Sequence, residues 1–177
     1  MRTGNALLLP LLLACASPQA ADLQSPRLGV TASAHALATR DNLVFPDGRG
    51  LPPGSGTIEL GAQLFEQRCV SCHGARGIGG PGGELSGGNP DLTAAQPDKT
   101  IGSYWPHATT LFDFVRRAMP LHAPWSLSND EVYALVAYLL DVNDIDVPGR
   151  RLDSDTLRAI RMPNRDGFDP IDADWQP

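Results

Sequence analysis

The sequence predicts a small all-α protein, for two reasons. Three segments carry apolar residues at the three- and four-residue spacing of an amphipathic helix, and no segment reads as a convincing strand. The 177 residues include 18 glycines and 16 prolines but only 6% aromatic residues, so the chain has little bulk with which to build a core. A large apolar group at the centre of the domain would supply that bulk.

The first predicted helix covers about residues 57–69. Its apolar stripe consists of Leu60, Leu64 and Phe65, which recur at helical spacing. Gly61 has no side chain, so a second helix could cross the first at this point. The sequence therefore predicts a close helix–helix contact in this segment.

The two other predicted helices lie in the second half of the chain. One covers roughly residues 110–118 and ends before Pro120. The other starts at Ser128, which forms a capping box with Glu131. One apolar face then continues to about residue 140, formed by Val132, Leu135, Val136 and Leu139.

The segments outside these helices are rich in glycine and proline. Residues 74–103 contain no convincing helix or strand, and their recurrent glycines predict a loop whose backbone lies close to another part of the molecule. Residues 22–56 and 142–177 are predicted to be an extended N-terminal arm and a C-terminal tail, with one or two helical turns around 154–160. Disordered tails usually lack apolar anchors, so we expect both segments to wrap the domain at 57–141 or a partner, with a free tail as the alternative. The anchors are Leu43, Val44, Phe45, Ile160, Met162 and Phe168.

Residues 1–21 have the composition of an export signal. Arg2 precedes an apolar run that is shorter than the roughly 20 residues a membrane-spanning helix needs. Small residues follow at Ala20 and Ala21, so we expect cleavage there and a periplasmic mature protein. The alternative is a lipoprotein signal, because the stretch LLAC at 12–15 resembles the motif in which the cysteine, here Cys15, receives a lipid anchor.

The charge balance excludes one class of partner. The net charge is −6 at pH 7, and a nucleic-acid-binding protein needs a clustered basic face. We therefore expect no nucleic-acid partner, and a membrane association only through a lipid on Cys15.

Residues 69–73 read Cys-Val-Ser-Cys-His, the C-x-x-C-H signature of covalent haem attachment. Each thiol adds across one haem vinyl group, and two intervening residues let both sulfurs reach the same edge of the porphyrin. Cys69 and Cys72 are therefore predicted to hold one haem c, and His73 to be an axial ligand of its iron. A zinc site would need a second Cys or His pair, a thioredoxin-like pair would need a βαβ unit, and a disulfide over this spacing would be strained.

The second axial ligand has four candidates: Met119, Met162, His107 and His122. We favour Met119, because it directly precedes Pro120 at a helix end, where the chain turns and can present a thioether. Met162 also precedes a proline, but it lies beyond the last firm helix. The two histidines are more typical of surface positions.

Ligation by one His and one Met favours electron transfer. It raises the reduction potential relative to two His ligands, and it leaves no vacant position on the iron. Two alternatives remain. A haem enzyme acting on a sulfur compound or a peroxide would need an exchangeable ligand, and a haem-based sensor would need an output domain.

The predicted helices resemble those of a known class. Gly61 and Phe65 in the first helix, with Tyr133 and Tyr138 in the last, resemble the crossed terminal helices of class I cytochromes c. The resemblance implies the class I fold, with three to four helices around one covalent haem, extended by the N- and C-terminal arms.

A narrower resemblance covers roughly two-thirds of the chain. It is similar to the SoxD-type cytochrome c subunits of periplasmic sulfur or sulfite dehydrogenases. The stretches that carry it are GLPPGSGT (50–57), CVSCHG (69–74), IGSYWPHATTLFDFVRRAMP (101–120), SLSNDEVYALVAYLL (126–140) and MPNRDGF (162–168).

This resemblance implies a set of partners and roles. A molybdenum-cofactor subunit would oxidise the sulfur compound, this chain would take the electrons singly, and a downstream cytochrome or oxidase would receive them. The haem-binding roles carry over to Cys69, Cys72, His73 and Met119. Some members have two haem domains, whereas this chain has one C-x-x-C-H. A stand-alone cytochrome, or the partner of a related molybdoenzyme, therefore remains an alternative.

Overall fold

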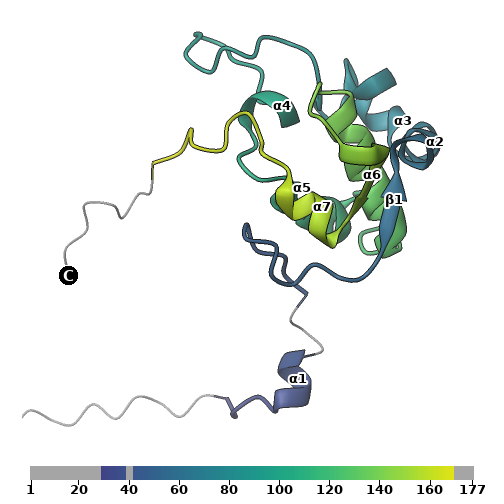
Figure 1. Cartoon of the computed structure of the whole chain (residues 1–177), viewed down its shortest axis with the longest axis vertical. Helices are drawn as coiled ribbons and strands as arrows, with labels where there is room; N and C mark the ends of the chain where they lie inside the picture. The colour runs from purple at the N-terminus through teal and green to yellow at the C-terminus, as the bar shows by residue number, and fades with distance from the viewer. Residues whose placement is uncertain (1–28, 39–41, 170–177) are drawn as a thin grey trace, which may run out of the picture.

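Helices dominate the structure, a computed structural model that describes residues 29–38 and 42–169. The three longest described helices are α2 (Ile58–Arg68), α5 (Ala108–Ala118) and α6 (Asn129–Asp141), and they match the three predicted segments. Both α2 and α5 pack against α6 (Figure 1). The shorter helical elements are α1 (Ala34–Ala38), α3 (Val70–His73), η1 (Ala75–Gly77), α4 (Ile101–Tyr104), η2 (Pro148–Arg150) and α7 (Ser154–Ala159). The all-α prediction is thus confirmed for the core.

The contact between α2 and α6 depends on a glycine, as predicted. A Cβ atom at Gly61 would collide with the carbonyl oxygen of Ala134 in α6. The same crossing brings the Phe65 and Tyr138 rings to a centroid distance of 5.2 Å. The predicted apolar stripe was wrong at Leu60, which is 39% exposed. Ile58 is buried instead, because the face of α2 that meets α6 is centred on Gly61.

The start of α6 agrees with the predicted capping box. The Ser128 N–H donates to a carboxylate oxygen of Glu131 (2.8 Å), and the Glu131 N–H donates to the Ser128 hydroxyl (3.3 Å). The Thr57 hydroxyl accepts from the Leu60 N–H in the same way (3.3 Å) and starts α2. These bonds satisfy backbone donors that the first turn of a helix leaves without an intrahelical partner.

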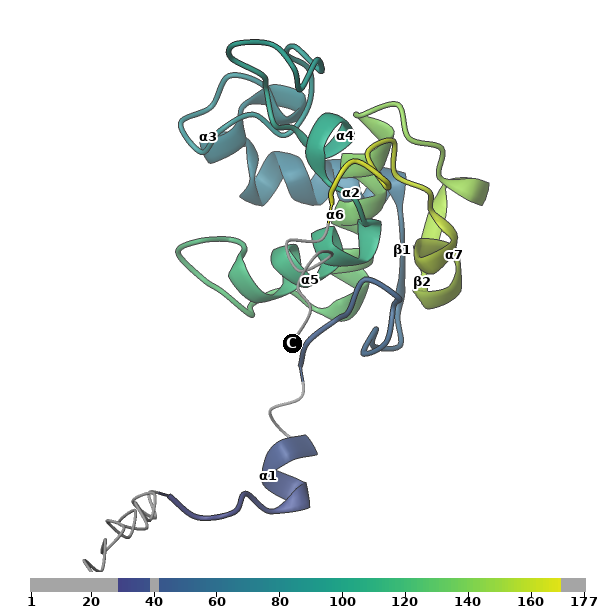
Figure 2. The same ribbon diagram turned by 90° about the vertical axis from the view of Figure 1, so that its left-hand side faces the viewer.

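A two-stranded antiparallel ribbon, which the sequence did not predict, joins the arm to the tail. Strand β1 (Ser55–Thr57) pairs with β2 (Arg151–Asp153), with Ser55 opposite Asp153. Each strand has three residues, too few to show the alternation that identifies a strand in a sequence. In Figure 2 this ribbon and α7 lie on one side of the helices, and α3 lies on the other.

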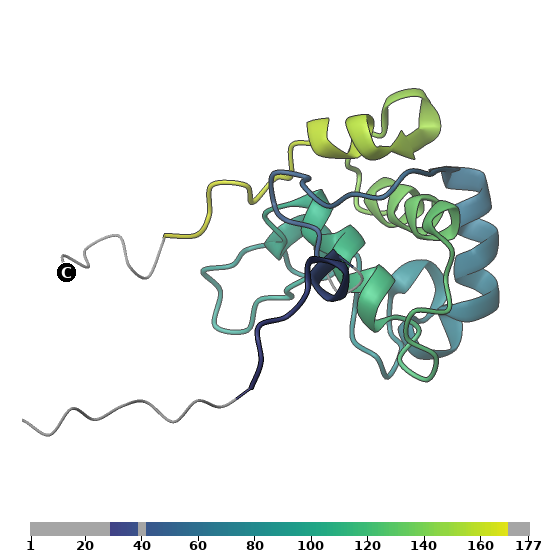
Figure 3. The same ribbon diagram turned by 90° about the horizontal axis from the view of Figure 1, so that it is seen from below.

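The arm and the tail contribute to the same hydrophobic core as the helices. Val44, Ile160 and Met162 are buried, whereas Leu43 and Phe168 are about half exposed. Leu152 of β2 and Leu157 of α7 are also buried. The segment of the tail that carries α7 (yellow-green) lies against the helices in Figure 3. The boundaries predicted for the haem domain, 57–141, therefore cut across one continuous core.

The predicted export signal, Cys15 included, lies outside the described residues. Within residues 29–38 and 42–169, no helix has both the length and the apolar composition to span a bilayer.

Candidate haem site

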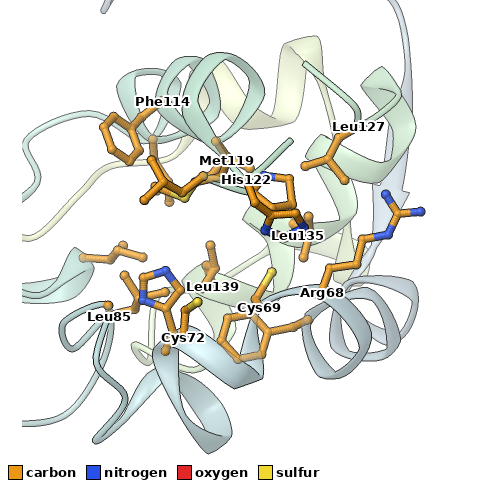
Figure 4. Close-up of a pocket in the computed structure, with 18 of the residues that line it drawn as sticks. Arg68, Cys69, Cys72, Leu85, Phe114, Met119, His122, Leu127, Leu135 and Leu139 are labelled. Atoms are coloured by element: carbon orange, nitrogen blue, oxygen red, sulfur yellow. The ribbon is translucent and has the colours of Figure 1, made fainter. Parts of the chain in front are cut away.

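A cavity opens between the end of α2 with α3 on one side and residues of α5 and α6 on the other (Figure 4). Its empty space is about 1040 Å³, open solvent at its mouth included. Apolar side chains supply most of its lining: Phe65, Leu85, Ile101, Trp105, Leu111, Phe114, Val115, Leu127, Leu135 and Leu139.

One turn of helix brings the three residues of the C-x-x-C-H motif to this cavity. Cys69, Cys72 and His73 all line it. The N–H groups of Cys72 and His73 both donate to the Cys69 carbonyl, at 3.1 and 2.9 Å. Because residues three and four apart share a helix face, this turn places both thiols and the imidazole on one side. The spacing of the motif thus places all three side chains on one wall of the cavity.

A backbone contact fixes the orientation of the His73 ring. Nδ1 of His73 donates to the carbonyl oxygen of Gly83 at 3.0 Å, which leaves Nε2 as the nitrogen available to a metal. Histidines that ligate metals usually donate their other ring N–H to an acceptor of this kind, which sets the tautomer.

The glycine-rich loop lies against α3, as its composition predicted. The Gly82 N–H donates to the Cys72 carbonyl at 2.6 Å. A Cβ at Gly80 would collide with that carbonyl, and one at Gly82 would approach Cε1 of His73 to 3.1 Å. The glycines are therefore needed because the loop backbone packs directly on the haem-attachment turn.

The sulfur chemistry of this wall suits a thioether. Burial raises the pKa of the Cys69 thiol to about 11, so the group is neutral at physiological pH. In the part of the chain that the structure describes, no three His, Cys, Asp or Glu side chains gather as a metal site.

Met119 lies across the cavity from Cys72, the residue that directly precedes His73 (Figure 4). It is the C-terminal cap of α5, and its N–H still donates to the Val115 carbonyl at 3.1 Å. The helix therefore sets the direction of its side chain, and the bond to Pro120, which is cis, ends the helix. His122 also lines the cavity, although the sequence suggested an ordinary surface position.

The remaining candidate ligands lie elsewhere. Met162 is 1% exposed and belongs to the hydrophobic core, outside the cavity lining. His107 precedes α5 and is also outside the lining, and burial is the main reason that its pKa is lowered. The structure therefore brings Cys69, Cys72, His73 and Met119 together and excludes Met162 and His107.

Sequence reasoning missed part of the wall. Leu85 and Ile101 line the cavity but come from the segment predicted to be irregular. Ile101 begins α4, and Thr100 and Ser103 form a capping box there. That four-residue pattern was the signal that could have located the short helix.

The residues present fit a covalently attached haem. Two sulfurs and an oriented imidazole line the same space as a thioether, among apolar side chains. Such a set can hold the edge of a macrocycle and both axial positions of its iron, while apolar walls keep water away.

Comparisons with known proteins agree with this geometry. Residues 58–143 match the family model described as cytochrome c. The solved structure of the sulfane dehydrogenase SoxCD from Paracoccus pantotrophus matches with a TM-score of 0.74 and 40% sequence identity, covering 85% of this chain and 75% of the matched chain. No curated protein matches the sequence.

These matches settle the family and the cofactor. A cytochrome c domain implies an electron-transfer role and covalently bound haem c. The chain is therefore a class I c-type cytochrome, a member of the cytochrome c family that resembles the SoxD-type cytochrome subunits of sulfur dehydrogenases.

Proposed function

We propose that this chain carries one haem c on Cys69 and Cys72, with His73 and Met119 as axial ligands, and that it takes single electrons from a molybdenum dehydrogenase acting on a sulfur compound. The observation that carries the proposal is that Met119 lies across an apolar cavity from Cys72, and that His73 lines the same cavity. Haem c supplies a one-electron couple in such a site. We further propose a periplasmic location and a downstream cytochrome or oxidase as the acceptor.

The residues around the cavity have distinct roles in this proposal. The Gly83 carbonyl holds the His73 ring in one orientation, so the change of one charge requires little rearrangement. Met119 occupies the second axial position and keeps other ligands out. The apolar side chains, among them Leu135 and Leu139, exclude water from the wall that α6 supplies.

The need for a catalytic partner follows from an iron that has no free axial position. An iron with both axial positions filled by side chains cannot bind sulfite, thiosulfate or a sulfane sulfur. The oxidation of the sulfur compound must then occur on another subunit. The match to a sulfane dehydrogenase supports a partner of that kind, and the resemblance to SoxD-type subunits supports molybdenum as its cofactor.

Three arginines near the cavity differ in their availability to a partner. Arg68 lines the mouth but pairs with Glu131 at 3.3 Å, and Arg117 pairs with Asp113. The guanidinium of Arg116 lies 5.4 Å from the centre of the Trp125 ring, which is about half exposed. In this acidic chain, these arginines would steer an acidic surface of the partner toward the haem. The rate of haem reduction by the partner would therefore fall as the salt concentration rises.

The test mixes the oxidised cytochrome with sulfite or thiosulfate, with and without the candidate molybdoenzyme, and follows haem reduction by absorbance. Fast reduction is expected only with the enzyme present, and more slowly at high salt. Reduction by the cytochrome alone would show that it acts on the sulfur compound itself. Carbon monoxide added to the reduced protein is the control, because a site closed by Met119 should show little spectral change.

A further inference from the structure

Helix α5 has a second face whose polar residues are not explained by haem binding. Leu111, Val115 and Met119, spaced four residues apart, line the cavity. Thr109, Asp113 and Arg117 have the same spacing but lie outside the cavity lining. The helix that carries Met119 is therefore also held from another side.

The N-terminal arm is what binds this second face. The Val44 N–H donates to Oδ1 of Asp113 at 2.9 Å, in a buried contact. The Thr109 hydroxyl donates to the Pro46 carbonyl at 2.9 Å. Nε of Arg117 donates to the other carboxylate oxygen of Asp113 at 2.9 Å. The carboxylate of Asp113, only 7% exposed as a residue, thus joins the arm to the end of α5.

The arm segment at residues 43–51, which we call the arm turn, is itself well defined. The Phe45 N–H donates to the Arg49 carbonyl at 2.9 Å, and the Gly48 N–H donates to the Phe45 carbonyl at 2.8 Å. Gly50 has a φ of +87°, and a Cβ there would collide with the Leu43 carbonyl, so the turn closes tightly. The Tyr133 hydroxyl then ties Pro52, just beyond the turn, to α6 at 2.8 Å.

The other side of Met119 offers much less support. Pro120 is buried, but most of the chain between residues 121 and 126 is exposed, with Leu121 at 79%. The two backbone hydrogen bonds between residues 120 and 126 are local, from Ala123 to Pro120 and from Ser126 to Ala123. The position of Met119 is therefore set chiefly from α5, and α5 is held in turn by the arm turn.

We propose that Asp113 is a positioning residue for Met119: by bonding the arm turn to α5, it keeps the thioether against the haem iron and limits its displacement by other ligands. The inference rests on the proposed ligation by Met119. It assigns a role in ligation to a segment that precedes the haem domain and touches neither the haem-attachment motif nor the cavity.

The test measures how tightly imidazole binds to the oxidised holoprotein, because imidazole must displace Met119 to reach the iron. Asp113→Ala should increase imidazole affinity at least tenfold, which corresponds to about 1.4 kcal/mol. Thr109→Val, which removes one neutral hydrogen bond to the arm turn, should increase it about threefold. The near-infrared band of methionine-to-iron ligation should weaken in the same order. Asp113→Asn keeps an acceptor for the Val44 N–H and should recover part of the effect.

Tyr133→Phe is the matched control, because it removes a hydrogen bond that ties the arm to α6 instead of α5. It should lower the melting temperature and leave imidazole affinity within about twofold of wild type. Equal affinities in all variants, or an equal increase in Tyr133→Phe and Asp113→Ala, would overturn the positioning role. If Asp113→Ala does not yield folded protein, the comparison of imidazole affinity between Thr109→Val and Tyr133→Phe decides. A wild-type protein without the near-infrared band would instead contradict the ligation by Met119.

Discussion

At the scale of single residues, two methionines of similar local sequence have different fates. Met119 and Met162 are each followed by a proline, so the dipeptide does not separate them. Their positions relative to the helices separate them. Met119 caps α5 at the cavity, whereas Met162 lies in the core beyond α7. The placement of Met119 could be predicted because Pro120 marks the helix end. The cavity position of His122 could not, because it depends on how an exposed loop folds back.

The two methionines provide a paired prediction. Met119→Ala should abolish the near-infrared band and lower the reduction potential, because the thioether ligand is lost. Met162→Ala should keep the band but lower the free energy of unfolding by about 2–5 kcal/mol, because a buried side chain is truncated. Near-infrared absorbance, potentiometry and denaturant unfolding measure the three quantities. Loss of the band in Met162→Ala would show that Met162, and not Met119, is the ligand.

At the scale of elements, the sequence was informative wherever a signal was local. The amphipathic spacing located α2, α5 and α6, and the capping box located the start of α6. Gly61 located the crossing of α2 and α6. The ribbon of β1 and β2 gave no local signal, because its register depends on partners more than 90 residues apart, such as Ser55 and Asp153. The stripe of α2 was misassigned at Leu60 for the same reason, since its orientation is set by α6.

The capping box of α6 gives a prediction with a pH dependence. The hydrogen bond from the Ser128 N–H is the largest cause of the lowered pKa of Glu131. Its carboxylate therefore stabilises the fold fully above its unfolded-state pKa, near 4.3, and loses this contribution as pH falls through the lower folded-state pKa. Glu131→Ala should cost about 1 kcal/mol at pH 7, and this difference should shrink below about pH 4.

Urea unfolding of the two proteins across this pH range measures the difference. Glu66→Ala, at an exposed position of α2, is the matched control and should change the free energy of unfolding by less than about 0.5 kcal/mol. A cost for Glu131→Ala that stays constant down to pH 3 would contradict the role of its ionised carboxylate.

At the scale of the whole molecule, the arm and the tail complete one core. Leu152, Leu157 and Met162 are almost fully buried, although all three lie beyond the predicted end of the haem domain at residue 141. A chain that ends at residue 141 would expose the surfaces they cover. The sequence could predict that these segments carry anchors, but not which of them pack, because Leu43 and Val44 have similar side chains and opposite burial.

Shortening the chain tests whether the tail and the helices form one core. The holoprotein ending at residue 141 should lose cooperative unfolding, or unfold at a melting temperature lower by more than 10 °C, because several buried side chains are removed at once. A chain ending at residue 169, the last described residue, is the control and should unfold like the full-length protein. Both are followed by haem absorbance and circular dichroism. An unchanged melting temperature for the shorter chain would show that residues 57–141 fold independently.

The order of the elements along the chain also has a consequence for assembly. Translation supplies Cys69 and Cys72 first, Met119 follows 46 residues after His73, and the wall formed by Leu135 and Leu139 comes later still. Until α6 exists, Gly61 has no helix to cross, and until β2 exists, β1 has no partner. Contacts between distant parts of a chain form late in folding. Until these long-range contacts form, both thiols would be accessible to haem, and the pocket would then close around a cofactor that is already attached.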